Sequence, residues 1–267
     1  MTALAAVLGF PVGHSRSPAM HNAAFEALGL DWRYLKLPVP PERFEETVRA
    51  LPASGYRGVN VTIPHKRAAL ELADEASPAA QAIGAANTLT FEGGRITADN
   101  TDAPGLLDAL SEVPRTAMVL GAGGAGRAAA WALREAGAEV LVWNRTPERA
   151  ERLASELGVE AVPEPIEAEL LVNATSVGLD PATTEEQALE ELHLSAIRNP
   201  KSAILDLVYG DTPPALTRWA TANASRVIDG LEILVRQGAR SFSLWTGVEA
   251  PIEDMRSAAR IENEAYP

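Results

Sequence analysis

The chain has 267 residues, a length that favours two domains over one small core or three domains. Its 23 basic and 36 acidic residues give a formal net charge of −13, which disfavours non-specific binding to nucleic acid or to an anionic membrane. It has no cysteine, and this excludes disulfides, cysteine-ligated metals and thiol catalysis. No apolar run reaches the roughly 20 residues that span a bilayer, and the N-terminus lacks a basic signal region. We therefore expect a cytoplasmic globular protein.

The first hundred residues alternate between strand-like and helix-like patterns. Strands are predicted over 3–9, 32–38 and 58–63, and a hairpin over 87–91 and 95–99. Helices are predicted over 18–28, 41–51 and 66–73, the first with Ser17 as its N-cap and Gly29 just beyond its end. This alternation favours an α/β fold with a mostly parallel sheet.

The second half of the chain has a sharper βαβ pattern. Strands are predicted over 117–120, 139–143, 170–173, 203–206 and 226–228, and helices over 127–136 and 147–157. We expect a Rossmann-type domain over 103–235 and a substrate-binding domain over 1–102. The final segment, 236–267, is predicted to form helices over 236–246 and 252–265. It has no strand of its own, so we expect it to pack back on the first domain. The acidic segment 180–200 is predicted to be a peripheral helix and loop.

A glycine-rich motif, Gly121-x-Gly123-x-x-Gly126, follows the strand over 117–120 and opens a helix. In this context the first glycine permits a tight turn, the second lets the backbone approach a pyrophosphate, and the third lets the helix pack on the strand. The free N–H groups of the helix start favour an anion. The motif predicts dinucleotide binding, and the alternative is a glycine-rich turn only.

The residues that follow the strand over 139–143 bear on the choice between NAD and NADP. An NAD site usually has Asp or Glu there, whereas this chain has Asn144-Arg145-Thr146 with Arg149 one helical turn on. The guanidinium of Arg145 suits a 2′-phosphate, and Thr146 adds a hydroxyl. The pattern predicts NADP. The alternative is that Thr146 caps the next helix and the arginines are solvated.

Two serines, Ser15 and Ser17, stand two residues apart at a turn that enters a helix. Two hydroxyls and a helix N-terminus in an otherwise acidic chain suit a small carboxylate. The alternative is that Ser17 only caps the helix and Ser15 only forms the turn.

A strand end and a helix start carry a second group of polar residues. Strand alternation places Asn60 and Thr62 on one face at the end of their strand, where ligands gather in open α/β sheets. Lys66 lies just beyond, at a helix start whose field favours loss of its proton, which suits proton transfer. The alternative for Lys66 is a solvated surface lysine.

Two further segments, Asn87-Thr88 and Asn100-Thr101-Asp102, could hydrogen-bond the hydroxyls of a polyol, although Asn and Asp are also turn residues. The residues alone thus predict an NADP-linked reductase of a small polyhydroxylated acid.

These segments together resemble the shikimate dehydrogenase family. The matching stretches span nearly the whole chain in the family's order and are 13–18 with His21-Asn22, 60–66, 84–88, 100–102, 121–126, 144–146, 173–178, 206–209 and 229–237. The resemblance implies reversible NADPH-linked reduction of 3-dehydroshikimate to shikimate, in aromatic amino-acid and chorismate biosynthesis.

The resemblance also implies a role for each matching residue. Lys66 would transfer the proton, assisted by Asp102. The other substrate residues would be Ser15 and Ser17 on the carboxylate, and Asn60, Thr62, Asn87, Asp102, Gln237 and Tyr209 around the ring. The cofactor residues would be Gly121, Ala122, Gly123, Gly124, Ala125, Gly126, Asn144, Arg145, Thr146, Arg149, Thr175, Leu207 and Gly230. Position 207 is Leu where some relatives have Met.

Two alternatives remain open at this point. One is a dual quinate/shikimate dehydrogenase, commonly NAD-linked, and the absence of a carboxylate beside Arg145 argues against it. The other is a non-catalytic, cofactor-sensing protein on the same scaffold, which would be expected to lack the Lys66 and Asp102 pair. We expect no metal, a small-molecule substrate, no nucleic-acid or membrane partner, and a monomer or homodimer.

Overall fold

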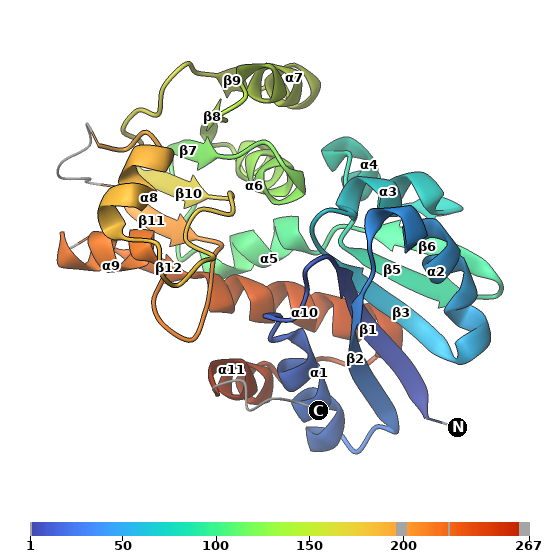
Figure 1. Ribbon diagram of the computed structural model, residues 1–267. Helices are drawn as coiled ribbons and strands as arrows, with labels where there is room; N and C mark the ends of the chain where they lie inside the picture. Colours follow the sequence, from blue (N-terminus) through green and yellow to red (C-terminus); the bar gives the residue numbers. More distant parts are fainter. Residues whose placement is uncertain (1, 196–201, 224, 262–267) are drawn as a thin grey trace. The chain divides into compact units, whose positions relative to one another are not determined.

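The computed structural model describes residues 2–195, 202–223 and 225–261. The chain forms two compact units, which we call unit 1 (Met1–Gly105 with Leu234–Pro267) and unit 2 (Leu106–Ile233) (Figure 1). Both boundaries fall inside helices, namely α5 (Asp102–Ala109) and α10 (Gly230–Thr246). Each unit has its own six-stranded sheet.

The sheet of unit 1 is mixed but mostly parallel. Its strand order is β2 (Trp32–Pro38), β1 (Ala3–Gly9), β3 (Tyr56–Val61), β5 (Thr88–Glu92), β6 (Arg95–Asp99) and β4 (Glu75–Ala76). The pairs β1–β2, β1–β3 and β4–β6 are parallel, whereas β5 lies antiparallel between β3 and β6. The hairpin predicted around residues 93–94 is confirmed.

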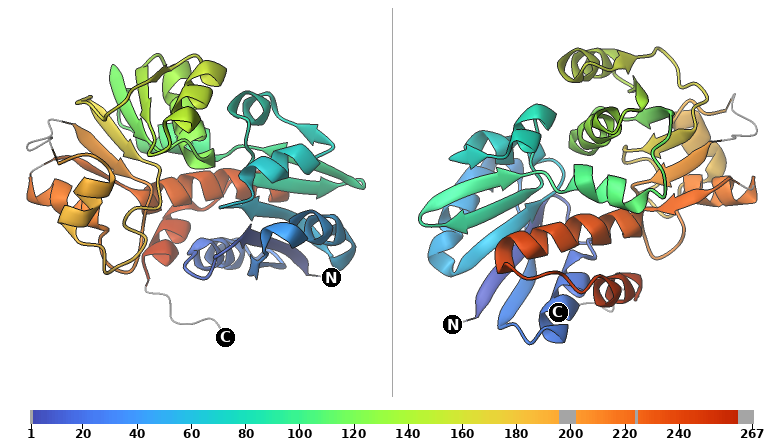
Figure 2. Two further views of the ribbon diagram at one scale, coloured as in Figure 1. Left: turned by 45° about the horizontal axis from the view of Figure 1, so that its top comes forward. Right: turned by 180° about the vertical axis from the view of Figure 1, so that it is seen from behind.

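Helices cover both faces of this sheet because its buried side chains alternate. In β1, Ala6 and Leu8 pack with α2 (Phe44–Ala50), α3 (Lys66–Leu72) and α4 (Pro78–Ile83). On the other face, Ala5 and Val7 pack with α1 (Ser17–Ala27), α10 and α11 (Ile252–Arg260). Helix α11 lies beside α1 (Figures 1 and 2). The C-terminal helices therefore return to the first unit, as the sequence predicts.

The sheet of unit 2 is entirely parallel. Its order is β12 (Val227–Asp229), β11 (Ala203–Asp206), β10 (Leu170–Asn173), β7 (Thr116–Leu120), β8 (Glu139–Trp143) and β9 (Glu160–Ala161). Counted from β7, this is the 3-2-1-4-5-6 order of a doubly wound Rossmann sheet. Helices α6 (Gly124–Glu135) and α7 (Pro147–Leu157) cover one face, and α8 (Glu185–Glu191) and α9 (Ala215–Ala222) pack on the other.

The prediction that Ser17 caps the first helix is wrong, and the alternative that Thr146 caps its helix holds only for its position. The N-cap of α1 is Arg16, whose backbone is already helical, so Ser17 is the first helical residue and makes no cap. Thr146 does occupy the N-cap position of α7, but its side chain forms no capping hydrogen bond. The hydroxyl of Thr146 is therefore not committed to the helix.

Several short elements differ from the prediction or were missed. The helix predicted over 41–51 divides into a 3-10 turn (Pro41–Arg43) and α2, with a second 3-10 turn over Pro52–Ser54. Helix α5 was not predicted, because it contains Pro104 and Gly105, two residues of low helix propensity. Helices α4 and α9 and strands β4 and β9 are too short to show a clear period. The expected helix and loop over 180–200 contain α8, and 196–200 lie outside the described residues, as does the end of the helix predicted over 252–265.

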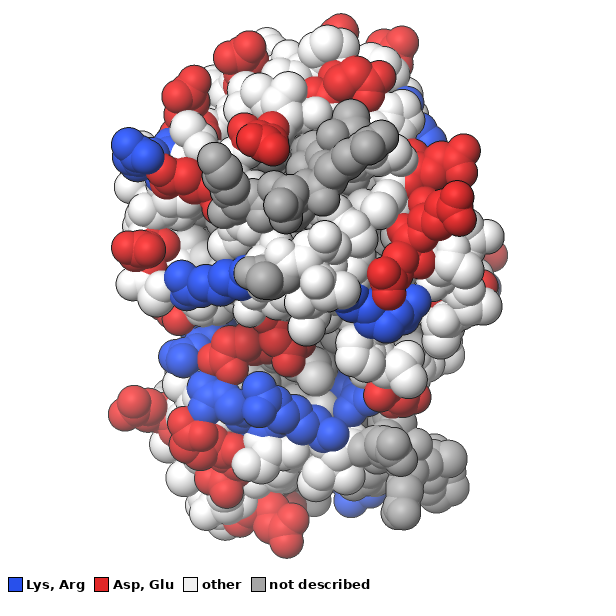
Figure 3. Space-filling model, turned by 90° about the vertical axis from the view of Figure 1, so that its left-hand side faces the viewer, with Lys and Arg blue, Asp and Glu red and all other residues white. Residues whose placement is uncertain are grey.

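On the face that Figure 3 shows, acidic and basic side chains lie side by side, so this face is neither uniformly acidic nor uniformly basic. In the described part of the chain, no helix is long and apolar enough to cross a membrane. An anion that binds this acidic chain must therefore find locally arranged donors.

Candidate active site

A lysine–aspartate ion pair lies at the centre of the polar residues of unit 1. Lys66 begins α3 and Asp102 begins α5, and the Lys66 Nζ lies 2.6 Å from the Asp102 Oδ2. The side chains are 13% and 19% exposed, so the pair is shielded yet open to a small ligand. The other carboxylate oxygen, Oδ1, accepts a 2.8 Å hydrogen bond from Nδ2 of Asn87. Both oxygens of Asp102 are held, and the ammonium is therefore oriented.

Asn87 links this pair to the rest of the cluster. Its Nδ2 also lies 2.9 Å from Oγ1 of Thr101 and 3.1 Å from Oε1 of Gln237. Its Oδ1 accepts from the backbone N–H of Thr101 at 2.7 Å. Asn87 is 2% exposed and Gln237 is 6% exposed. Four of the predicted substrate residues thus meet at one place: Lys66, Asn87, Asp102 and Gln237.

Asn60 and Thr62 lie at the same strand end, as expected from their sequence. Asn60 lies in β3 and donates to the backbone oxygen of Asn87 at 3.3 Å, which joins it to the cluster. Thr62 follows β3 directly and is half-buried, and its backbone N–H donates to Leu8 at 2.9 Å.

The two predicted carboxylate-binding serines are buried at the turn before α1. Ser15 and Ser17 are 5% and 3% exposed, and the N–H of Ser17 donates to Oγ of Ser15 at 3.3 Å. Between them, Arg16 is also buried and donates to the carbonyls of Ala259 and Ile261, each at 2.9 Å. The guanidinium thereby anchors the serine turn on the C-terminal end of α11.

The glycine-rich turn of unit 2 is built on contacts that allow no side chain at two positions. Gly121 has a φ of +108°, and a Cβ there would lie 2.9 Å from the carbonyl oxygen of Ala174. A Cβ on Gly126 would collide with the carbonyl of Gly121. At Gly123, by contrast, a Cβ would meet no atom within 4 Å. The turn is therefore tight on its inner side and open at the N-terminus of α6.

The turn after β8 supports this loop. Oδ1 of Asn144 accepts from the N–H of Ala122 at 3.1 Å, and its Nδ2 donates to the carbonyl of Thr146 at 2.9 Å. Arg145, Thr146 and Arg149 are exposed. The predicted 2′-phosphate residues thus lie directly beside the glycine-rich loop and face solvent.

Asn173 and Asp206, which lie in two of the matching stretches, form a buried hydrogen-bond network that the sequence did not predict. Asn173 Oδ1 accepts from both N and Oγ1 of Thr175, at 3.1 and 2.7 Å. Its Nδ2 donates to Asp206 Oδ1 at 2.9 Å, and the N–H of Val208 donates to the same oxygen at 3.1 Å. A Cβ on Gly230 would meet the carbonyls of Asp206 and Val208. Asn173 and Asp206 therefore support the loops that carry Thr175 and Leu207, and Gly230 packs closely against the second of these loops.

Asp206 is 1% exposed, and burial raises its pKa to about 6 despite hydrogen bonds from Val208, Asn173 and Thr217. Tyr209, the remaining predicted substrate residue, follows in unit 2, so its contact with a ligand held by unit 1 remains a prediction.

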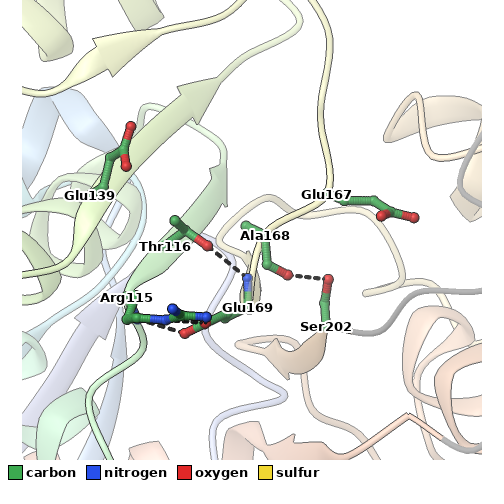
Figure 4. Close-up of a pocket in the computed structure, with 7 residues that line it drawn as sticks. All are labelled: Arg115, Thr116, Glu139, Glu167, Ala168, Glu169 and Ser202. Atoms are coloured by element: carbon green, nitrogen blue, oxygen red, sulfur yellow. Dashed lines mark hydrogen bonds and ion pairs between the residues drawn. The ribbon is translucent and has the colours of Figure 1, made fainter.

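A separate hollow of about 580 Å³ lies at the opposite edge of the unit 2 sheet (Figure 4). It is lined by residues at the amino ends of four strands, namely Arg115, Thr116, Glu139, Glu167, Ala168, Glu169 and Ser202. Arg115 and Glu169 form an ion pair across it, and that arginine lowers the pKa of the glutamate. Ligands of open α/β sheets bind at the carboxyl ends of strands, so this hollow is not the candidate site.

Unit 2 has a doubly wound parallel sheet with a glycine-rich turn, and unit 1 holds a lysine–aspartate pair. Together these features define the class of two-domain, dinucleotide-linked oxidoreductases. Three family models match the chain: "Shikimate dehydrogenase substrate binding domain" at residues 7–89, "Shikimate / quinate 5-dehydrogenase" at 108–206, and "Shikimate 5'-dehydrogenase C-terminal domain" at 230–260. The chain belongs to the shikimate dehydrogenase family.

Relatives and solved structures agree with this assignment. The shikimate dehydrogenase (NADP(+)) of Thermus thermophilus is 48% identical over 265 residues, which cover 96% of this chain and 97% of that protein. The enzyme of the same name from Methanopyrus kandleri is 44% identical, covering 96% and 94%. A crystal structure of the Thermus thermophilus enzyme in complex with NADP(H) and shikimate superposes with a TM-score of 0.87, covering 97% of this chain and 98% of that one.

The glycine-rich turn can be tested by a pair of matched substitutions. Gly126→Ala must push the loop and α6 apart, so we expect it to lower the free energy of unfolding by about 1–3 kcal/mol in urea. Gly123→Ala meets open space at a φ of −81°, so we expect a change within about 1 kcal/mol. Equal destabilisation by the two variants would contradict the packing argument.

The buried Asp206 predicts a pH-dependent stability. Its pKa rises from 3.8 unfolded to about 6 folded, so the folded state binds the extra proton between these values and loses stability as pH rises through them. Relative to wild type, the unfolding free energy of Asp206→Asn should therefore rise by about 2–3 kcal/mol as the pH increases from about 4 to about 7. Denaturant titrations at several pH values measure this, with the exposed Asp180→Asn as the control. Parallel pH profiles for wild type and Asp206→Asn would refute the assignment.

Proposed function

We propose that the protein is an NADP-dependent shikimate dehydrogenase, which reversibly reduces 3-dehydroshikimate to shikimate in chorismate and aromatic amino-acid biosynthesis. The observation that carries the proposal is the Lys66–Asp102 pair, 2.6 Å apart and ringed by buried amides, in a chain whose relatives carry this activity in their names. A cofactor-sensing protein without catalysis would have no need of that pair.

Unit 1 is proposed to be the substrate domain. The serine turn supplies two hydroxyls for the substrate carboxylate, and the cluster around Lys66 supplies donors and acceptors for the ring hydroxyls. The residues assigned to the substrate are Ser15, Ser17, Asn60, Thr62, Lys66, Asn87, Asp102 and Gln237, with Tyr209 from unit 2. Buried amides and hydroxyls that are already bonded to one another orient the ring with little loss of side-chain entropy.

Unit 2 is proposed to hold NADP. The open space at Gly123 and the N–H groups at the start of α6 fit a pyrophosphate, while Asn144, the exposed Arg145 and Thr146 with Arg149 fit the adenosine ribose and its 2′-phosphate. Gly121, Ala122, Gly124, Ala125 and Gly126 shape the loop, and Thr175, Leu207 and Gly230 are assigned to the nicotinamide side. When bound, NADPH supplies the hydride for the substrate carbonyl.

Lys66 is proposed to be the acid in the reduction. As the carbonyl carbon gains a hydride, its oxygen gains negative charge, which the nearby ammonium of Lys66 stabilises before it donates its proton to that oxygen. In the reverse direction the neutral amine accepts the proton of the substrate hydroxyl. Asp102 orients the ammonium through the 2.6 Å ion pair.

Removing the acid should reduce turnover more than binding. We expect Lys66→Ala to lower kcat by about 10²–10⁴-fold with a modest change in the KM for shikimate, because the substrate keeps its carboxylate and hydroxyl contacts. Steady-state assays of NADPH formation measure both constants. Arg67→Ala, which removes the exposed neighbouring cation, serves as the control. Near-wild-type turnover in Lys66→Ala would exclude Lys66 as the acid.

The cofactor preference should depend on Arg145. We expect Arg145→Ala to raise the KM for NADP at least about tenfold more than the KM for NAD, since only NADP carries the 2′-phosphate that a guanidinium would bind. The matched control is Arg152→Ala, which removes an exposed cation of α7, the helix that follows Arg145. An equal effect of Arg145→Ala on both cofactors would contradict the phosphate contact.

A further inference from the structure

Tyr34 is a buried tyrosine of β2 whose backbone is held by a neighbouring asparagine. Asn22 on α1 donates from Nδ2 to the carbonyl of Tyr34 at 3.1 Å, and its Oδ1 accepts from the N–H of Tyr34 at 2.8 Å. This two-way contact mimics an added strand and fixes both the position and the direction of the Tyr34 backbone.

The ring of Tyr34 is held by His21, the residue before Asn22 on α1. The imidazole of His21 stacks on it with ring centroids 4.3 Å apart and planes 2° from parallel. His21 is completely buried, and neither of its ring nitrogens has a hydrogen-bond partner among the described residues. Burial lowers the pKa of His21 to about 3, so the ring is neutral at any pH of function. His21 and Asn22 thus both act on Tyr34. The two residues belong to one of the matching stretches, but the proposed function gives them no role.

The hydroxyl of Tyr34 contacts the amide of Asn60. It donates to Oδ1 of Asn60 at 2.8 Å, in a place where both side chains are buried. On the other side of the amide, Nδ2 of Asn60 lies 2.7 Å from Oγ of Ser241. The same nitrogen lies 3.1 Å from Oγ1 of Thr88 and 3.3 Å from the carbonyl oxygen of Asn87.

These contacts fix which way the amide of Asn60 points. The carbonyl of Asn87 can only accept, so it requires the nitrogen and not the oxygen of Asn60 on that side. The hydroxyl of Ser241 donates to the carbonyl of Gln237 at 3.1 Å and is therefore left to accept from Asn60. With both N–H groups engaged and one lone pair of Oδ1 taken by Tyr34, a single lone pair of Oδ1 remains.

We propose that Tyr34, held by His21 and Asn22, is a positioning residue that locks Asn60 as a hydrogen-bond acceptor for one ring hydroxyl of the substrate. The inference rests on the proposed function, in which Asn60 contacts the ring. Without the Tyr34 hydroxyl, the amide loses the donor that holds its oxygen. The contacts of Nδ2 with Asn87 and Ser241 still orient the amide, but its oxygen is no longer held in place, so its hydrogen bond to the substrate hydroxyl weakens.

An acceptor fixed in this way gives specificity as well as affinity. A substrate hydroxyl donates to Oδ1 of Asn60. An analogue that has hydrogen in place of this hydroxyl leaves one lone pair of the buried oxygen without a donor. The wild-type protein should therefore discriminate against that one deoxy analogue, and the discrimination should depend on Tyr34.

The test is Tyr34→Phe, which removes one atom and leaves the stacked ring in place. We expect the KM for shikimate to rise about 3- to 10-fold, the size of one lost hydrogen bond, with the KM for NADP unchanged. Tyr56→Phe removes the same atom from another buried tyrosine of the same unit and is the matched control. Thermal unfolding of each variant shows that the fold is retained.

A series of shikimate analogues, each lacking one ring hydroxyl, separates positioning from a general loosening. We expect Tyr34→Phe to reduce the penalty for one analogue only, and Asn60→Ala to abolish the penalty for the same analogue. In Asn60→Ala, the further change Tyr34→Phe should have less than about a twofold effect, since the two residues act through one contact.

The outcomes separate this inference from the function on which it rests. Wild-type turnover of shikimate is measured first, and its absence would contradict the proposed function. With normal wild-type turnover, an unchanged KM in Tyr34→Phe, or an equal effect on every analogue, would overturn the role of Tyr34 alone.

Discussion

The ion pair between Lys66 and Asp102 is the interaction around which the polar cluster of unit 1 is organised. A partly buried charge pair is costly unless every lone pair and proton of its partners is used. Asn87 binds the second oxygen of Asp102 and is itself held by Thr101 and Gln237. Because Asn87 directly precedes β5, Thr101 directly precedes α5 and Gln237 lies in α10, the network requires the sheet, the hairpin and the returning C-terminal helix together.

Unit 2 meets a different constraint, which is to hold an anion in a chain of charge −13. The solution is local: a turn whose glycines exclude side chains, the N-terminus of α6, and exposed arginines after β8. Asn144 connects the first and last of these, so the loop and the arginine turn keep a fixed relation within the unit. Local donors with fixed directions can bind phosphate even where the long-range field is unfavourable.

The sequence predicts most of the long elements and the class of site, because buried strands, the glycine motif and polar strand ends leave strong patterns. It does not reveal α5, where Pro104 and Gly105 argue against a helix that tertiary packing nevertheless stabilises. Nor does it reveal Tyr34 or Ser241, whose partners lie far away in the chain and leave no periodic signal. The roles of Asn173 and Asp206 stay hidden for the same reason, since a strand-end Asn or Asp has the appearance of an ordinary turn residue.

The most direct measurement is the initial rate of reduced-cofactor formation, followed by absorbance, when the intact protein is given shikimate or quinate with NADP or NAD. We expect rapid NADPH formation from shikimate, a marked preference for NADP, and little turnover of quinate. Binding of shikimate and NADP without turnover would contradict the assigned role of Lys66 and Asp102. Faster turnover with NAD would contradict the assigned role of Arg145.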